Sequence, residues 1–240
     1  MSSSKSYISK IVDPEIYNEL NKPNQKYIMK ADKGHEDSII YVSSSFIIGK
    51  NEIPKDKDIG IKYLMYGTEL HLPKVMEQYG THLLLGEIMS KNEEEGIRLL
   101  NEVTTIQKDS NKKLFLVDYI LKNETYDIES ESNGFINFVL AKQILKEAAD
   151  MGNAQAMDEY GKICCKSKKN KYGEINADFN EAFKYYKMAS KKGYPSGMTH
   201  HGLFIRDGIG GAEIDIKEAQ KLFKEANEKG DFDGCAYYGN

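Results

Sequence analysis

The sequence has no tryptophan, five prolines and only three cysteines in 240 residues. Two of the cysteines, Cys164 and Cys165, are adjacent, and Cys235 leaves an odd total, so no disulfide framework is expected. Long hydrophobic runs are also missing. The longest apolar stretches, at 39–48 and 82–89, are shorter than the roughly 18 residues of a membrane-spanning helix. We therefore expect reduced thiols and no membrane insertion.

An excess of charge of either sign is absent as well. Lysine and arginine total 33 against 37 aspartate and glutamate. Nucleic-acid binders normally carry a basic excess, so we expect no nucleic-acid partner. The start of the chain, Met1 to Val12, is rich in serine and lysine and lacks the apolar stretch of a secretory signal. These features together favour a cytoplasmic location.

What the sequence does contain is a repeated pattern. An acidic residue, two alanines and a glycine recur at the same spacing in Asp178–Gly193 and Asp215–Gly230. More divergent copies start at Asp56, Asn92 and Asn137. Together with a first copy near residue 23, the anchor positions are 36 to 45 residues apart. A period in this range is typical of stacked helical units rather than of a single globular core.

Each repeat is expected to contain two helices. Asp178, Asp215 and Asn92 each precede a glutamate by three residues, which is a capping box for the second helix. Asn137 stands at the same offset in its repeat. The first helix carries a small residue followed five positions later by glycine, as in Ala156 with Gly161. A glycine inside a helix costs about 1 kcal/mol relative to alanine, so we expect the paired helix to cross directly over it.

Two repeats carry insertions between their helices. The segment 123–134 is polar and acidic, and the segment 165–176 includes four lysines, namely Lys166, Lys168, Lys169 and Lys171. Insertions in repeat proteins map to turns, so both are predicted to be long loops. The lysine cluster is interpreted as a solvated loop, with an electrostatic contact to an acidic partner or an anionic lipid surface as the alternative. We also expect the lysines to lower the pKa of Cys165.

These motifs resemble the Sel-one-like repeat family, which is related to the tetratricopeptide repeat. The resemblance rests on small-x4-Gly-x2-apolar-x2-Gly followed by Asp-x3-Ala-x6-Ala-x3-Gly, and it covers roughly residues 20–240. It implies an all-α fold, namely a right-handed α/α superhelical solenoid of helix-turn-helix repeats. It also implies an adaptor role, in signalling or in protein quality control at the endoplasmic reticulum.

Residues 1–20 would be an N-terminal segment or a degenerate cap. The solenoid would occupy residues 21–240, with units near 36–72, 73–107, 111–152, 154–193 and 195–230.

Catalytic, cofactor and metal motifs are not evident. The glycines of 208–211 lack the preceding strand of a dinucleotide site and the following lysine of a P-loop, so a structural turn is expected. His200 and His201 are adjacent in a helix and point to different faces, so they cannot chelate one metal. No nucleophile, base and orienting group can be assembled from local motifs. We expect a protein that is not an enzyme and has no cofactor or metal.

The groove lined by first helices is the predicted binding surface for a protein or peptide. Tetratricopeptide geometry would place the following residues in it: Glu77, Thr81, Asp158, Lys162, Lys166, Thr199, Leu203 and Arg206, with Ile40, Ser44, Ile47 and Leu84 further back. Lys162 and Arg206 together are predicted to clamp an acidic group. The function expected is a non-catalytic scaffold. The alternatives are a helical-repeat RNA-binding protein and the regulatory repeat region of a larger enzyme. Self-association through the incomplete repeat after Gly230 is a further hypothesis.

Overall fold

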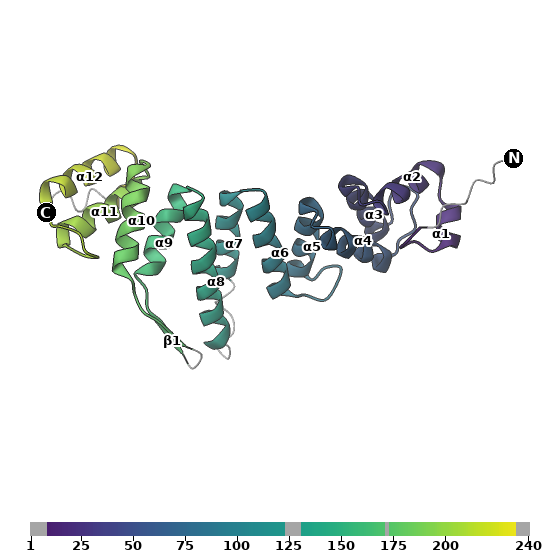
Figure 1. Ribbon diagram of the computed structural model, residues 1–240, viewed down its shortest axis with the longest axis horizontal. Helices are drawn as coiled ribbons and strands as arrows, with labels where there is room; N and C mark the ends of the chain where they lie inside the picture. Colours follow the sequence, from purple (N-terminus) through teal and green to yellow (C-terminus); the bar gives the residue numbers. More distant parts are fainter. Residues whose placement is uncertain (1–8, 123–130, 171–172, 234–240) are drawn as a thin grey trace. The chain divides into compact units, whose positions relative to one another are not determined.

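The computed structural model describes residues 9–122, 131–170 and 173–233, and these are almost entirely helical (Figure 1). The chain divides into two compact units, with the boundary between Gln107 and Lys108. Within each unit consecutive helices pack as antiparallel pairs. The prediction of an all-α solenoid of helix-turn-helix repeats is confirmed.

The first unit contains six helices among its described residues. They are α1 (Pro14–Glu19), α2 (Lys22–Ala31), α3 (Glu36–Ile48), α4 (Lys57–Glu69), α5 (Pro73–Leu85) and α6 (Glu93–Ile106). The closest pairs are α3 with α4 and α5 with α6. The short helix α1 buries Tyr17 in the same apolar cluster that holds Ile28 of α2 and Ile39 of α3. The segment before the first regular pair is therefore packed onto the repeats that follow it.

The described residues of the second unit form six helices and a small hairpin. They are α7 (Ser110–Lys122), α8 (Glu131–Asp150), α9 (Ala154–Cys164), β1 (Lys168–Asn170), β2 (Gly173–Ile175), α10 (Phe179–Lys191), α11 (Pro195–Asp207) and α12 (Ile216–Glu228). The pairs are α7 with α8, α9 with α10, and α11 with α12. In each pair the second helix covers the apolar face of the first.

The second helices start where the capping residues predict. The side chains of Asp178, Asp215 and Asn92 accept hydrogen bonds from the backbone N–H groups three residues later, at 2.9, 3.0 and 3.1 Å. Each bond satisfies a donor that the helix itself leaves without a partner. Gly193 and Gly230 adopt the left-handed conformation just after the helices end, as expected for glycine in that position.

The glycines inside the first helices are needed for close packing, as predicted. A Cβ atom on Gly161 would stand 2.5 Å from the ring of Tyr186 in the paired helix α10. At Gly202 the corresponding distance is 2.6 Å, to the ring of Phe223 in α12. Neither site has room for a methyl group, so the cost of glycine in a helix is offset by the contact of a large aromatic ring with the helix backbone.

The repeat at 110–150 departs from this pattern. The loop predicted for 123–134 is wrong from residue 131 onward, because α8 already begins at Glu131; residues 123–130 lie outside the described part. Asn137 is therefore inside α8 rather than at its start. The position that holds a small residue in the other first helices is Lys113, which is fully buried and pairs with Glu147 of α8 at 2.7 Å. The larger side chain requires a different packing of the two helices.

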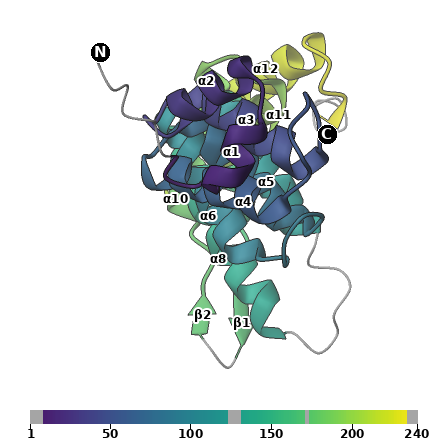
Figure 2. The ribbon, with the colours of Figure 1, turned by 90° about the vertical axis from the view of Figure 1, so that its right-hand side faces the viewer.

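The lysine-rich insertion after α9 contains strands, which corrects the prediction of a loop. β1 and β2 pair antiparallel, with Lys168 opposite Ile175. β1 packs against α8, and the Lys168 ammonium lies 5.4 Å from the centre of the Phe138 ring. Figure 2 shows both strands beside the lower part of α8, beyond the ends of the other helices of the second unit. Because the two strands pair, the insertion contains a β-ladder, which its lysine-rich composition does not predict.

Candidate partner-binding faces of the two units

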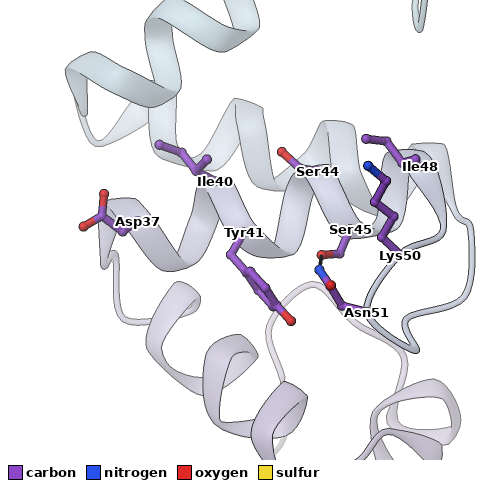
Figure 3. Close-up of a pocket in the computed structure, with 8 residues that line it drawn as sticks. All are labelled: Asp37, Ile40, Tyr41, Ser44, Ser45, Ile48, Lys50 and Asn51. Carbon is purple, nitrogen blue, oxygen red and sulfur yellow. Dashed lines mark hydrogen bonds between the residues drawn. The ribbon is translucent and has the colours of Figure 1, made fainter.

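In the first unit, one face of α3 remains open. A hollow of about 360 Å³ lies along this helix, and Figure 3 shows the residues that line it. The helix contributes six lining residues at helical spacing: Asp37, Ile40, Tyr41, Ser44, Ser45 and Ile48. We call this set the α3 stripe. Its spacing of three and four residues is that of a helical face which contacts another segment along its length. Ile48 has 52% of its surface exposed.

The side of the stripe that faces α2 is held rigidly. Tyr41 stacks on Tyr27 with 4.1 Å between ring centres, and its hydroxyl donates to Asn24 Oδ1 at 3.1 Å. Asn24 in turn donates to the carbonyl of Asn51, whose own amide donates to Ser45 Oγ at 2.9 Å. Burial raises the pKa of the Tyr41 hydroxyl, so it stays a neutral donor. The hollow is therefore a preformed surface.

The predicted groove residues of this unit fall on different sides of their helices. Ile40 and Ser44 belong to the α3 stripe, and Ser44 accepts a hydrogen bond from Gln78 of α5 at 3.0 Å. Thr81 is exposed and Glu77 is half-buried on α5. Ile47 and Leu84, however, are each only 7% exposed, which corrects their predicted place in the groove. The next residues, Ile48 and Leu85, are the exposed ones. The predicted register is thus off by one at this position.

In the second unit, Asp158 of α9 is the centre of a buried hydrogen-bond network. Its carboxylate is completely buried. One oxygen accepts from Ser196 Oγ at 2.8 Å and from the Lys162 ammonium at 2.9 Å. The other oxygen lies 2.8 Å from His200 Nδ1. The predicted groove residues Asp158 and Lys162 are thereby joined to α11, so this network fastens two neighbouring first helices together.

The charges of this network reinforce one another. Burial pushes the pKa of Asp158 upward, but the hydrogen bonds and charges of His200 and Lys162 outweigh it and hold the pKa below its ordinary value. Burial alone would lower the pKa of Lys162, but its bonds to Asp158 and Glu159 raise it. The net result is a pKa above the ordinary value. Both groups therefore stay ionised at neutral pH. The His200 ring also stacks on Tyr186, with 4.7 Å between ring centres.

Asp158, Ser196 and His200 are three residue types that also occur in hydrolase triads, but their geometry differs. In a triad the serine faces Nε2 of the histidine while the carboxylate bonds to Nδ1. Here Ser196 Oγ lies 3.5 Å from Nδ1, the nitrogen that Asp158 also contacts, and the serine donates its proton to Asp158. The arrangement therefore orients the helices and does not activate Ser196 as a nucleophile.

The remaining predicted residues of this unit are mixed in character. Thr199 is buried and donates to Asp231 at 2.6 Å. Arg206 makes two bonds to Asp207, at 2.7 and 2.8 Å. Leu203 is half-buried and Lys166 is exposed. Both members of the predicted Lys162–Arg206 clamp thus bind carboxylates of their own chain, and a partner would have to compete with these.

Two further expectations concern cysteine and histidine. Cys164 is buried, but burial raises the pKa of Cys165, which corrects the expectation that lysines lower it. The Cys165 sulfur lies 3.9 Å from the Tyr186 hydroxyl. His200 and His201 bond to different partners, Asp158 and Ser190, as their adjacency predicts. Within the described residues, no three His, Cys, Asp or Glu side chains gather as metal ligands.

Gly208, Gly210 and Gly211 form the structural turn expected of them. All three have positive φ angles, and a Cβ atom on Gly210 would lie 2.2 Å from the carbonyl oxygen of Phe179. Over the ranges that the structure describes, no helix has both the length and the apolar character needed to cross a membrane.

Comparisons with known proteins agree with the helix-pair architecture. The model of the Sel1 repeat family matches residues 73–102, 154–194 and 195–231. No curated protein matches the sequence. Among solved structures, a protective antigen of uropathogenic Escherichia coli strains that displays an SLR fold is 14% identical, with a TM-score of 0.50. The alignment covers 91% of this chain and 51% of that one, so this chain spans about half the length of the antigen.

Two more solved structures are similar. A Sel1 repeat protein from Oxalobacter formigenes is 16% identical, with a TM-score of 0.45 and coverage of 86% of this chain and 76% of that one. The Helicobacter pylori cysteine rich protein B is 21% identical, with a TM-score of 0.36 and coverage of 55% and 96%. At these identities the likeness concerns the fold alone.

Proposed function

We propose that this chain, in which residues 73–102, 154–194 and 195–231 match the Sel1 repeat family, is a non-catalytic scaffold which binds a protein or peptide partner on the faces of its first helices. The observation that carries the proposal is the α3 stripe. It is a continuous face of helix α3 that lines a hollow of about 360 Å³ and combines an exposed isoleucine with hydroxyl groups. Helical segments of partner proteins are bound by surfaces with this spacing.

The network around Asp158 supports the same role indirectly. Its hydrogen bonds fix α9 against α11, so side chains that project from these helices hold constant positions. Preorganised surfaces lose less conformational entropy on binding. In this proposal the exposed or half-buried residues Thr81, Lys166, Leu203 and Arg206 contact the partner. Asp158 and Thr199, which are buried, position their neighbours in the second unit, while Glu77 and Lys162 are half-buried on their own helices.

The setting of this scaffold is part of the proposal. Cys164 and Cys165 are free thiols, which supports a reducing compartment such as the cytoplasm. The adaptor roles that the family resemblance implies, in signalling or protein quality control, are compatible with such a location. Imaging of the tagged full chain in its native cells tests the location independently of binding.

A pair of matched variants tests the scaffold function. Ile48→Arg places a charge in the α3 stripe, whereas Met65→Arg places one on α4, at a residue of similar exposure (45% against 52%). Affinity capture with mass spectrometry from native cell extract should identify partners of the wild-type chain, and Ile48→Arg should lose them while Met65→Arg keeps them. Equal partner lists for the two variants, with equal circular dichroism spectra, would contradict binding at this face.

A further inference from the structure

A second opening lies in the other unit, between the first helices α7 and α9. This α7–α9 cleft has a volume of about 610 Å³. Its floor is apolar and includes Leu114 and Val117 of α7 and Leu145 of α8, the last of which is 2% exposed. Phe115 stands at its edge with 75% of its surface exposed. An apolar floor with a few polar groups around it is typical of a binding pocket.

The cleft exists because the bonds that close the neighbouring junction are missing here. Between α9 and α11, Ser196 and His200 both reach the carboxylate of Asp158. One repeat earlier, the equivalent positions are Gln155 and Glu159 on α9, facing Phe115 on α7. A phenyl ring accepts no such hydrogen bonds, and Glu159 bonds instead to Lys162 of its own helix at 3.0 Å. The two first helices are joined near their N-terminal ends, where the Asn153 amide donates to Ser110 Oγ at 3.2 Å and to Asn111 Oδ1 at 2.9 Å, and beside Phe115 apolar side chains lie between them.

The two charged residues that line the cleft are both acidic. Its lining includes the carboxylates of Asp118 on α7 and Glu159 on α9, and none of the lining residues is basic. Each carboxylate has a lysine four or three residues later on its own helix, Lys122 and Lys162 respectively. The pair of Asp118 with Lys122 is largely exposed, and such surface ion pairs contribute little to stability. A cation from a partner can therefore compete for these carboxylates.

We propose that the α7–α9 cleft binds a basic segment of a partner protein through an apolar anchor. An aliphatic or aromatic side chain enters between α7 and α9 and packs on Phe115 and Leu114. Arginine or lysine residues beside the anchor bond to Asp118 and Glu159 on the two rims. This inference rests on the proposed scaffold function and specifies the chemistry of its partner for the second unit.

Peptide selection tests the proposal directly. The probe is a display library of random 12-residue peptides, selected on the immobilised full chain, with affinities of the selected peptides measured by fluorescence polarisation. We expect enrichment of sequences that combine a large apolar residue with arginine or lysine. Phe115→Ser should weaken their binding at least tenfold. The matched control is Phe232→Ser, which alters a phenylalanine of nearly equal exposure (76%) elsewhere in the unit and should leave binding unchanged.

Charge reversal supplies the second arm. Asp118→Lys combined with Glu159→Lys should shift the selected sequences from basic to acidic residues beside the same apolar anchor. All these positions are at least partly exposed, so circular dichroism should show unchanged helicity. Selected peptides that bind Phe115→Ser as tightly as wild type, that are acidic, or that fail to appear at all would each overturn the proposal.

Two other outcomes separate this inference from the scaffold function. Peptides whose binding depends on Ile48 and not on Phe115 would overturn the α7–α9 cleft while supporting the face in the first unit. A concentration-dependent dimer in sedimentation that Phe115→Ser abolishes would assign the cleft to a second copy of this chain, and would equally overturn binding of a basic partner segment.

Discussion

The first helices α9 and α11 are joined by hydrogen bonds at Asp158, whereas α7 and α9 leave a cleft at the equivalent positions. First and second helices alternate in the same order on both sides. The difference comes from single residues at fixed places: aspartate or phenylalanine on one helix, and serine with histidine or glutamine with glutamate on the next. In a repeat fold, side chains at one position can thus decide whether a junction is closed or open to a ligand.

The largest change in stability is expected at the glycine where two paired helices cross. Gly161→Val places a branched side chain against the Tyr186 ring, and we expect the free energy of unfolding to fall by about 3 kcal/mol because the core is overpacked. The equivalent residue in the irregular repeat is Asp118, which is exposed. Asp118→Val should cost less than about 1 kcal/mol. Urea unfolding measures both, and similar losses in the two variants would contradict the packing described for Gly161.

The next largest effect concerns the closed junction itself. Asp158→Ala removes the acceptor of Ser196 and leaves Lys162 and His200 without their buried partner, so we expect a loss of about 2 kcal/mol in unfolding free energy. The control Asp118→Ala removes a carboxylate whose ion pair is exposed, and should change stability by less than about 0.5 kcal/mol. Equal values for the two aspartates would mean that the junction is not held by Asp158.

The pH dependence of stability gives a second test of the junction at Asp158. The folded state holds the pKa of Asp158 below its ordinary value of 3.8. The carboxylate therefore contributes stability that is present above the unfolded pKa and is lost as the pH falls through the lower folded pKa. The stability difference between wild type and Asp158→Asn should be constant above about pH 5 and should shrink at lower pH. A difference that grows on acidification would contradict this sign.

A smaller loss of stability is expected from removing a helix cap, and it should differ between a regular repeat and the irregular one. Asp178→Ala removes the cap of α10 and should cost about 1 kcal/mol. Asn137 occupies the same offset in the sequence, yet it lies inside α8. Asn137→Ala should therefore cost nothing measurable, because alanine is the better helix former in a helix interior. Thermal unfolding followed by circular dichroism distinguishes the two, and a loss of 1 kcal/mol in both would return the start of α8 to Asn137.

The smallest expected effect is at the surface ion pair beside the cleft. Lys122→Ala should change the unfolding free energy by less than about 0.5 kcal/mol, since both side chains of the pair with Asp118 are largely exposed. Lys162→Ala should cost more, because its partner Asp158 is buried. If adding salt removes the effect of Lys162→Ala as fully as that of Lys122→Ala, the two pairs do not differ in burial as the structure describes.

Most of the architecture follows from local chemistry. The caps at Asp178 and Asp215 and the closing glycines at 193 and 230 define the second helices, because each satisfies backbone groups within a few residues. The glycines at 161 and 202 indicate where helices cross, since only contact with another element explains them. The register of the groove was harder to predict. Ile47 and Ile48 are adjacent isoleucines, and their burial depends on how the paired helix α4 packs.

The sequence by itself determined that this protein is an array of helix pairs, because helix starts, stops and crossings are encoded by short spacings. Only the tertiary structure decided which first helices are closed on each other and which are not. The hydrogen bonds of Asp158 join residues 38 and 42 positions apart. The opening beside Phe115 arises because the equivalent bonds are missing there. Both depend on distances between separate helices, and no pattern within one helix can specify those.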